Sequence, residues 1–402
     1  MERERLERLA ERFLCPLISG ARLAGAIPST PQDQRVARRG PRSLLFKVDS
    51  ADDYRLIFRR SETFGPTARR IVEAFVDVLR EIEPALETSY EADVLRPLQK
   101  RILGRAITGG FMHAPMVTAV DWLESWAERS YEGQSVTAAL GFDPGAEGGD
   151  LTLEELTTLE FSAVLSNGVD TLVWMDPEGR VVGHAGLDVP KIAPGFAPYH
   201  HSALAAWAVE GRVAIAMTGA GDILVFKDSQ LMFAKRAGRW HFLTHRSLVT
   251  RMPVPHSIAV RQAIYESCLD ASFSSRGAAI GVVMKDKAPR WEQIVDRDDR
   301  LKRPRSLKTK ALDQLIAGRT FPELDRRFRL ELLSIDGALV LDHRGKVLAV
   351  GAILKIPGGS TGGGRLAAAR ELASLGLGIK VSQDGSMICL HGEAGKPVFS
   401  LL

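Results

Sequence analysis

The sequence predicts an α+β protein. In its C-terminal part, a mixed β-sheet is flanked by helices, and its N-terminal region is mainly helical. Two observations support this prediction. Apolar residues recur at helical spacing between Thr67 and Leu86. From Thr171 onward, short apolar runs alternate with tight Gly, Asp and Pro turns and with helix-like stretches. Helices and strands in such mixed order are typical of a sheet layered with helices.

The length of 402 residues fits two or three domains. Residues 1–150 are predicted to be a mainly helical region, with helices at Glu2–Phe13 and Thr67–Leu86 and a short strand at 43–48. The segment 141–149 is rich in Gly, Asp and Pro, so it reads as a loop or a domain boundary.

Residues 151–250 are predicted to be β-rich, and residues 251–402 to form a separate domain. In the middle region we expect strands at 171–175, 180–183, 213–218 and 223–226, and a helix at 202–209. In the last region we expect a helix at 256–272, a buried strand at 278–283, and a loop and helix within 285–310. A hairpin of 338–341 with 347–350 is expected next, then a Gly-rich loop at 357–364 and a helix from Arg365. The region is expected to end with strands at 378–382 and 386–390.

Composition excludes several classes of protein. Hydrophobic residues make up 45% and charged residues 25% of the chain, which is normal for a globular protein. The chain has no apolar run long enough for a membrane span, and its N-terminus is too charged for a secretion signal.

Three widely spaced cysteines favour a reducing, cytoplasmic setting. The net charge is only +4, and aromatic and basic residues are not interleaved, so nucleic acid is not an expected partner. The basic run 302–310 is interpreted as a solvated loop.

Two stretches of the chain can be superposed as an internal repeat. Residues 170–182 align without a gap on 336–348, and after a shift of two residues Thr218 meets Ser382. One interpretation is that any two hairpin–helix–hairpin segments look alike. The other is a duplicated domain whose first copy has lost its chemistry. In that copy Thr171-Leu172 replace a Gly-Ala pair, and His201 stands at the position of Arg365.

The Gly-rich loop before Arg365 has the features of a phosphate site. Glycines at the start of a helix expose backbone N–H groups, and the helix N-terminus adds partial positive charge. An arginine in the first helical turn opposes the helix dipole, a cost that a bound anion would offset. The candidate binding residues here are Thr361, Gly362, Gly363 and Gly364, and Arg365 is a candidate catalytic residue. The alternative is a flexible surface loop.

Asp336 is the candidate metal ligand and catalytic residue. It precedes two small residues, Gly337 and Ala338, and a hydrophobic strand. A carboxylate there could hold Mg²⁺ or Mn²⁺ and help to activate a 3′-hydroxyl for in-line attack, while the small residues leave space for a base or sugar. The alternative is an ordinary turn aspartate.

Together these motifs resemble the nucleotide-binding domain of diadenylate cyclases. The resemblance covers about 145 residues, from His256 to the C-terminus, and rests on Asp336-Gly-Ala, the Gly-rich loop with Arg365, and Val381-Ser382. It implies that Asp336 binds metal and acts in catalysis. It also implies that Gly337 and Ala338 line the nucleotide site, that the loop and Arg365 contact the triphosphate, and that Ser382 lies near the base.

The resemblance further implies that two ATP molecules are joined into cyclic di-AMP by two domains that face each other. The chain would then be at least a homodimer, with residues 1–250 as a sensor. One departure leaves an alternative open. The family loop ends Gly-Thr-Arg-His-Arg, whereas this chain reads Gly363-Gly-Arg-Leu-Ala367. Arg370 or Thr361 could compensate. Otherwise the domain would be a silent receptor for ATP or a cyclic dinucleotide, or the loop would be a mere connector.

Histidine pairs elsewhere in the chain are weaker candidates. His200 and His201 are adjacent but lack further ligands at metal-binding spacing, so a metal site is not expected there. His241 and His245 lie beside Trp240 and Phe242, and packing within an aromatic cluster is the interpretation we favour for them.

Overall fold

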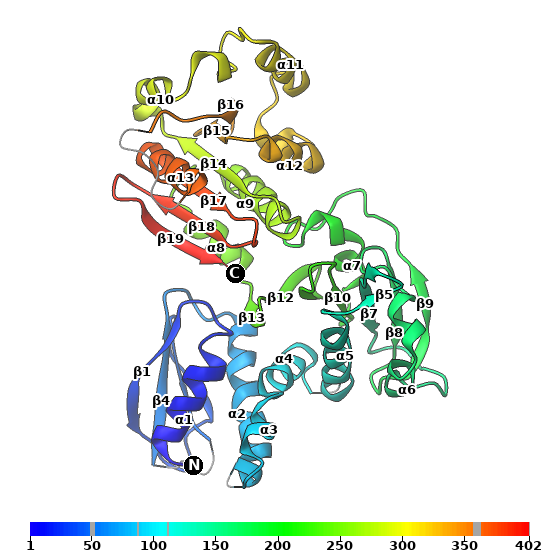
Figure 1. The fold of residues 1–402 in the computed structure, drawn as a ribbon. Coiled ribbons are helices and arrows are strands. Elements are labelled where there is room, and N and C mark those ends of the chain that lie inside the picture. Colours follow the sequence, from blue (N-terminus) through cyan, green and yellow to red (C-terminus); the bar gives the residue numbers. More distant parts are fainter. Residues whose placement is uncertain (49–52, 87, 111, 357–362, 402) are drawn as a thin grey trace. The chain divides into compact units, whose positions relative to one another are not determined.

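The computed structural model describes residues 1–402 except 49–52, 87, 111, 357–362 and 402. It is an α+β fold, as predicted, and it divides into two compact units (Figure 1). Unit 1 comprises residues 1–194 and 201–243, and unit 2 comprises residues 195–200 and 244–402. Among the described helices, none is both long and apolar enough to cross a membrane.

The N-terminal region contains the expected helices and, in addition, a four-stranded antiparallel sheet. Helix α1 (Arg3–Leu9) continues into a π-helical turn, and α2 spans Pro66–Leu86. The sheet has the order β1-β4-β3-β2, with β1 at Ala21–Pro28, β2 at Val36–Gly40, β3 at Ser43–Phe46 and β4 at Tyr54–Arg60. Sequence analysis indicated only β3, because arginines on the other three strands obscure their apolar alternation.

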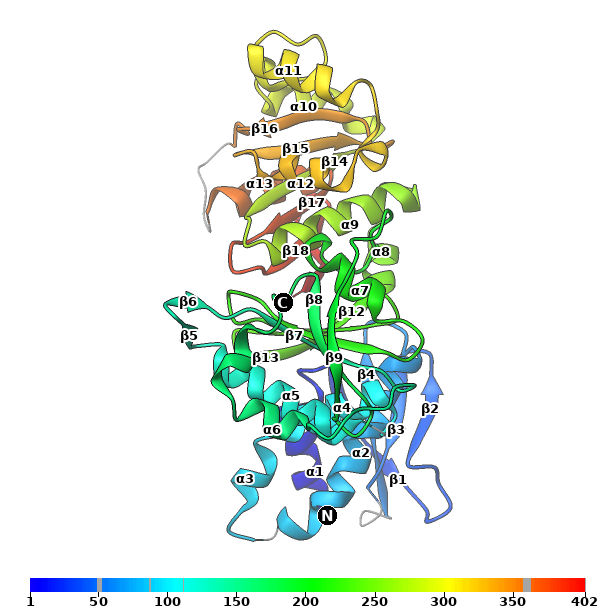
Figure 2. The same cartoon turned by 90° about the vertical axis from the view of Figure 1, so that its right-hand side faces the viewer.

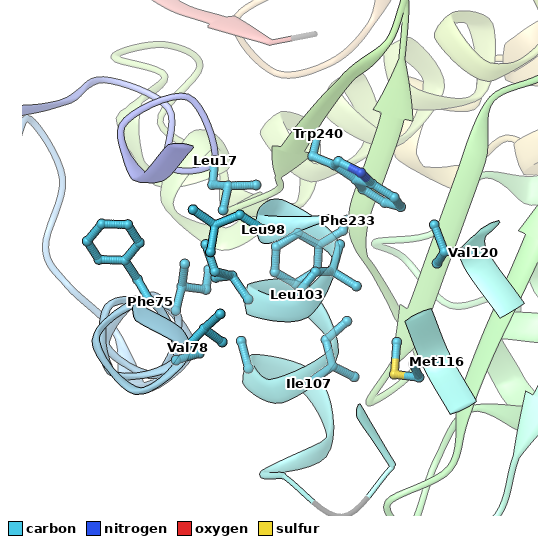
Figure 3. Close-up of a cluster of buried hydrophobic side chains, with 14 of the residues drawn as sticks. Leu17, Phe75, Val78, Leu98, Leu103, Ile107, Met116, Val120, Phe233 and Trp240 are labelled. Atoms are coloured by element: carbon cyan, nitrogen blue, oxygen red, sulfur yellow. The ribbon is translucent and has the colours of Figure 1, made fainter. Parts of the chain in front are cut away.

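The boundary expected near residue 150 is not a boundary between the two units. Helices α3 (Glu91–Leu95), α4 (Leu98–Thr108) and α5 (His113–Trp126) follow α2. Figure 3 shows Phe75 of α2, Leu103 of α4 and Met116 of α5 in one hydrophobic cluster with Phe233 and Trp240 of the next sheet. This shared core makes the N-terminal region and the second sheet one unit.

The second sheet of unit 1 has seven strands in the order β13-β12-β11-β10-β7-β8-β9. Its strands are β7 (Ala138–Phe142), β8 (Thr171–Met175), β9 (Val181–Gly186), β10 (Val213–Met217), β11 (Ile223–Lys227), β12 (Gln230–Arg236) and β13 (Arg239–Phe242). The short hairpin β5 (Ser130–Tyr131) and β6 (Gln134–Ser135) precedes it, and α6 (Leu153–Thr157) and α7 (Ser202–Trp207) are inserted within it. The loop expected at 141–149 therefore starts inside the fully buried strand β7.

Unit 2 contains a six-stranded sheet in the order β16-β15-β14-β17-β18-β19. Its strands are β14 (Ala278–Val283), β15 (Ala338–Asp342), β16 (Val347–Ala352), β17 (Gly376–Val381), β18 (Met387–His391) and β19 (Lys396–Leu401). Its helices are α8 (His245–Arg251), α9 (Ile258–Phe273), α10 (Ala288–Ile294), α11 (Leu307–Ile316), α12 (Arg326–Ser334) and α13 (Gly364–Leu375). The unit starts at Thr244 rather than at residue 251, because α8 packs on α9 and β19.

Helices pack against the central strands of this sheet (Figure 2). Helix α13 packs on β14, β17 and β18, and Gly281 of β14 faces Leu372 of α13 at a distance that leaves no room for a side chain. Helices α9 and α12 pack on each other and also contact β14. The strand β14, buried along its whole length, is thus the centre of unit 2.

The two larger sheets share one topology. In each, the first strand (β7 or β14) pairs parallel with the first strand of a following hairpin and antiparallel with the strand after a helix. The register also matches. Leu140 of β7 lies opposite Val173 and Ile215, and Ile280 of β14 lies opposite Leu339 and Ile379, at the offsets of the sequence repeat.

The hairpin turns repeat the same hydrogen bonds. The Asp176 carboxylate accepts from the backbone N–H groups of Glu178 and Arg180, and the Asp342 carboxylate accepts from those of Arg344 and Lys346. Generic hairpins would not need to share register, helix placement and turn chemistry. The repeat therefore reflects a duplicated fold.

Candidate functional site

A cavity of about 360 Å³ lies in unit 2, where the start of β15, the end of β16 and the first turn of α13 meet. It brings together five residues singled out from the sequence, namely Asp336, Gly337, Ala338, Gly364 and Arg365. Its remaining lining is small or apolar: Ala279, Ala352, Ile353, Leu354, Ile356 and Ala368.

The sheet explains how distant segments converge on this cavity. Helix α12 ends at Ser334, and the chain then passes through Asp336 into β15. Parallel pairing places Ala338 opposite Ala279 of β14, so both strands begin at the cavity. Antiparallel pairing of Ala338 with Ala352 brings the end of β16 to the same edge.

Asp336 presents an exposed carboxylate at this edge. Its Oδ1 accepts a hydrogen bond from the Gly337 backbone N–H at 3.1 Å. Within the described part of the chain, no lysine or arginine forms an ion pair with it. The nearby Lys308 instead contacts the Asp299 carboxylate and the Gly351 carbonyl, at 2.7 and 2.8 Å. The carboxylate is therefore available to a cation.

Gly337 is required by the backbone as well as by space. Its φ is +107°, and an added Cβ would lie 2.5 Å from the carbonyl carbon of Gly351 on β16. Any side chain here would push β15 and β16 apart. The absence of a side chain at Gly337 is therefore required by the close approach of the two strands, and its part in leaving room for a nucleotide remains a prediction.

Arg365 extends across Gly277, the residue before β14. A Cβ added at Gly277 would collide with the Arg365 guanidinium. In the described residues this guanidinium makes no hydrogen bond or ion pair, although it lies beside several packed elements. An arginine without a counter-ion at a helix N-terminus is expected to attract an anion.

The glycines at the start of α13 leave open space. Gly363 is the N-cap of the helix, with a φ of +88°, and Gly364 is its first residue. An added Cβ on either would meet no described atom within 4 Å. Thr361 and Gly362, the other loop residues predicted to bind phosphate, lie outside the described residues.

Ser382 does not line the cavity. It follows β17 and forms a tight turn, in which its N–H donates to the Ser386 carbonyl at 2.8 Å. Because Val381 pairs with Ala278, Ser382 lies at the same sheet edge as Gly277, but with β14 between it and Asp336. Its predicted position near a base remains a prediction.

Two of the three positions that depart from the family loop are packed into the protein. Leu366 packs against the cluster of Ala369, Ala373 and Leu390, and Ala367 is buried. Arg370, considered above as a substitute, lines a neighbouring cavity of about 400 Å³ with Arg290 and Glu371 instead. The two cavities share Ile356.

A polar pair beside Asp336, formed by Lys308 and Asp299, was not predicted from the sequence. Lys308 belongs to the basic run interpreted as a solvated loop, but Ser306 caps α11, and Lys308 reaches from that helix to the edge of β16. Asp299 holds it there and also lies 3.4 Å from the Ile353 backbone N–H. The contacts of Lys308 with Gly351 and of Asp299 with Ile353 join residues 43 and 54 positions apart in the chain, so no local pattern could reveal them.

The equivalent region of unit 1 is closed. Leu172, which corresponds to Ala338, is fully buried, and His201, which corresponds to Arg365, is buried with its Nδ1 2.9 Å from the Gly168 carbonyl. The Asp170 carboxylate accepts from the Asn167 side-chain amide at 2.6 Å. The groups that stay free in unit 2 are thus engaged within the protein in unit 1.

Other candidates do not form sites in the described residues. Searched over that part of the chain, His, Cys, Asp and Glu form no group of three that could hold a metal. His245 stacks on Phe196, with ring centroids 5.3 Å apart, and lies 2.8 Å from the Tyr265 hydroxyl. It thus packs in an aromatic cluster, but the rings that it contacts there are those of Phe196 and Tyr265, whereas Trp240 and Phe242 were expected. Burial raises the pKa of Cys15 to about 11, which makes its thiol a poor nucleophile.

Comparison with known proteins identifies no family for this chain. No family model matches the chain, and no curated protein matches it. Among solved structures, it is similar to a crystal structure of a double mutant of DacA from Staphylococcus aureus, with 13% sequence identity and a TM-score of 0.25. That likeness covers 35% of this chain and 86% of the other. A likeness at this level is no evidence for an activity.

Proposed function

We propose that unit 2 binds ATP in the cavity between Asp336 and Arg365 and condenses two ATP molecules into cyclic di-AMP. One observation carries the proposal. A carboxylate and a guanidinium from different elements line the same cavity, and neither has a charged partner among the described residues. Protein charges left unpaired at one cavity suit a ligand that brings both an anion and a cation, such as a metal–triphosphate complex.

Each residue has a role in this proposal. The Arg365 guanidinium and the backbone N–H groups of Gly363 and Gly364 hold the triphosphate, because all of them donate toward an anion at a helix N-terminus. Asp336 holds Mg²⁺ or Mn²⁺. Mg²⁺ is commonly held by one or two carboxylates plus substrate phosphates and water, so a single carboxylate is a sufficient protein ligand. The bound ion would neutralise phosphate charge.

The reaction is a double nucleotidyl transfer. The 3′-hydroxyl of each ATP loses its proton to solvent and attacks the α-phosphorus of the other. A new P–O bond forms as the bond from the α-phosphorus to the α–β bridging oxygen breaks, and pyrophosphate leaves. Two sites must face each other for both transfers, so the active species is at least a homodimer. Unit 1, with its closed copy of the fold, would act as the sensor of a cytoplasmic protein.

A second candidate is a receptor that binds ATP or a cyclic dinucleotide without turnover. The observation that favours it is the packing of Leu366 and Ala367, where the family loop carries a histidine and a second arginine. Arg365 is the one basic residue among the described residues that line the cavity. With a single basic residue, the cavity could bind the phosphates of ATP but would stabilise the departing pyrophosphate poorly.

Incubation of the purified full chain with ATP and Mn²⁺ or Mg²⁺, analysed by mass spectrometry, separates the two candidates. The cyclase predicts a cyclic di-AMP peak that falls by roughly 100-fold or more in Asp336→Ala, the usual cost of losing one preorganised charge-stabilising group. ATP that is bound but stays intact would support the receptor. Full turnover by Asp336→Ala would contradict the role of Asp336.

A further inference from the structure

A second cavity, of about 560 Å³, lies on the four-stranded sheet of unit 1, far in sequence from the proposed ATP site. Its lining residues come from the start of β1, the β2–β3 turn and the end of β4. Figure 2 shows these strands side by side in one sheet. Four arginines line it, together with small residues: Gly20, Arg22, Gly40, Pro41, Arg42, Ser43, Arg59, Arg60 and Ser61. None of these described lining residues is acidic or aromatic.

Strand register forces two of the arginines together. Arg22 of β1 lies directly opposite Arg59 of β4, and Ser43 of β3 lies on the other side of Arg59. Directly opposed residues point to the same face of a sheet with Cβ atoms roughly 5 Å apart, and like charges in this arrangement destabilise the pair. Fold stability alone gives no reason for this placement.

The arginines of the cavity differ in their partners. Arg60 is buried and structural: its guanidinium donates to the Glu62 carboxylate at 3.1 Å and to the Thr63 carbonyl at 2.8 Å. Arg22, Arg42 and Arg59 are exposed, and in the described part of the chain they form no hydrogen bond or ion pair through their side chains. Three guanidinium groups are therefore available to a ligand.

Ser43 supplies an independent observation. Its hydroxyl oxygen is buried and lacks a hydrogen-bond partner among the described residues. A buried polar atom without a partner costs free energy, and most such atoms in folded proteins are satisfied. Ser43 lines this cavity between Gly40 and Arg59, so a bound acceptor could complete its hydrogen bonding.

We infer that this cavity binds a small organic phosphate carrying at least two negative charges. An arginine guanidinium can donate two parallel hydrogen bonds to two oxygens of one phosphate. Three arginines of this cavity have no side-chain partner among the described residues. The volume lies in the range of small-molecule sites. The described lining offers no aromatic surface on which a base could stack, so the phosphates, rather than a base, would be recognised. This inference is independent of the ATP site and gives unit 1 a ligand.

The test uses the full chain carrying Arg365→Ala, so that the cavity of unit 2 does not contribute. Isothermal titration with inorganic pyrophosphate is compared between this parent, the pair Arg22→Ala with Arg59→Ala, and the pair Arg38→Ala with Arg39→Ala. The last pair removes the same charge from exposed positions on β2 that do not line the cavity. We expect the first pair to lose about tenfold or more in affinity and the second to stay close to the parent.

Thermal melting without ligand separates a binding role from a structural one. Because Arg22 and Arg59 repel each other, their removal should leave the melting temperature equal or higher. A parent that binds no pyrophosphate, or equal losses in both pairs, would overturn the inference. So would tight binding of a short single-stranded oligonucleotide without pyrophosphate binding, since the surface would then belong to nucleic acid.

Discussion

Gly277 determines where the Arg365 guanidinium can lie. Its φ is in the ordinary range, so alanine is compatible with the backbone, but the added methyl group would collide with the arginine. We expect Gly277→Ala to displace Arg365 and to weaken ATP binding about tenfold. A double-mutant cycle checks the cause: in the Arg365→Ala background, Gly277→Ala should have no further effect on ATP affinity. Additive losses would show that Gly277 acts by another route.

At the residue scale, five of the residues singled out from the sequence line the cavity of unit 2, but the sequence does not show what surrounds them. Asp336, Gly337 and Arg365 were found because their types and spacing carry chemistry. Lys308 and Asp299 were not found, because their contacts with β16 depend on tertiary packing. Leu366 packs into an apolar cluster because of the face that α13 turns toward the sheet, and a sequence motif does not show which face that is.

At the scale of elements, a buried ion pair fixes the helix that leads into Asp336. Arg326 of α12 donates from Nε and Nη2 to the Asp270 carboxylate of α9, at 2.7 Å each, and also to the Ala197 carbonyl. The same carboxylate accepts from the Tyr199 backbone N–H at 2.7 Å. Segment 195–200 is thereby attached to unit 2.

Breaking this pair should destabilise unit 2 strongly. Asp270→Asn would remove the negative charge that the buried Arg326 guanidinium faces at 2.7 Å, and we expect a loss of about 3 kcal/mol in the free energy of unfolding. Urea denaturation followed by circular dichroism measures the loss. Asp313→Asn on the exposed side of α11 is the matched control, with an expected change within roughly 0.5 kcal/mol. Equal effects of the two changes would contradict a structural role for the pair.

The strands of unit 2 could be predicted because they are apolar runs bounded by turns. Strand β14 was found with its observed bounds, and β15 and β17 within two residues. Strands β1, β2 and β4 were missed, since arginines stand where a half-buried strand would show apolar alternation. Three of these arginines, Arg22 of β1 with Arg59 and Arg60 of β4, also line the cavity of unit 1.

At the scale of the whole molecule, the copy of the fold in unit 1, whose equivalent region is filled by side chains, affects how many chains the proposed reaction needs. Its His201 and Leu172 fill the positions that Arg365 and Ala338 hold in unit 2, so the described residues of unit 1 do not repeat the cavity that is proposed to bind ATP. If two ATP sites must face each other, both come from unit 2 of separate chains. We therefore expect specific activity to rise with protein concentration until the dimer is complete.

Activity assays over a dilution series, with light scattering at each concentration, check this expectation. Specific activity that stays constant while the protein is monomeric would contradict it and would indicate that one chain suffices. The repeat itself was visible in the sequence, but the matched register and turn hydrogen bonds were needed to distinguish a duplicated fold from a chance likeness.

The central claim is that the cavity of unit 2 holds ATP through Arg365. Calorimetric titration of the full chain with ATP and Mg²⁺ tests it most directly. We predict that Arg365→Ala weakens ATP binding about tenfold or more, while Arg327→Ala, which removes the same charge from an exposed site on α12, leaves it unchanged. Absence of ATP binding by the unmodified chain, or an equal loss in both variants, would contradict the claim.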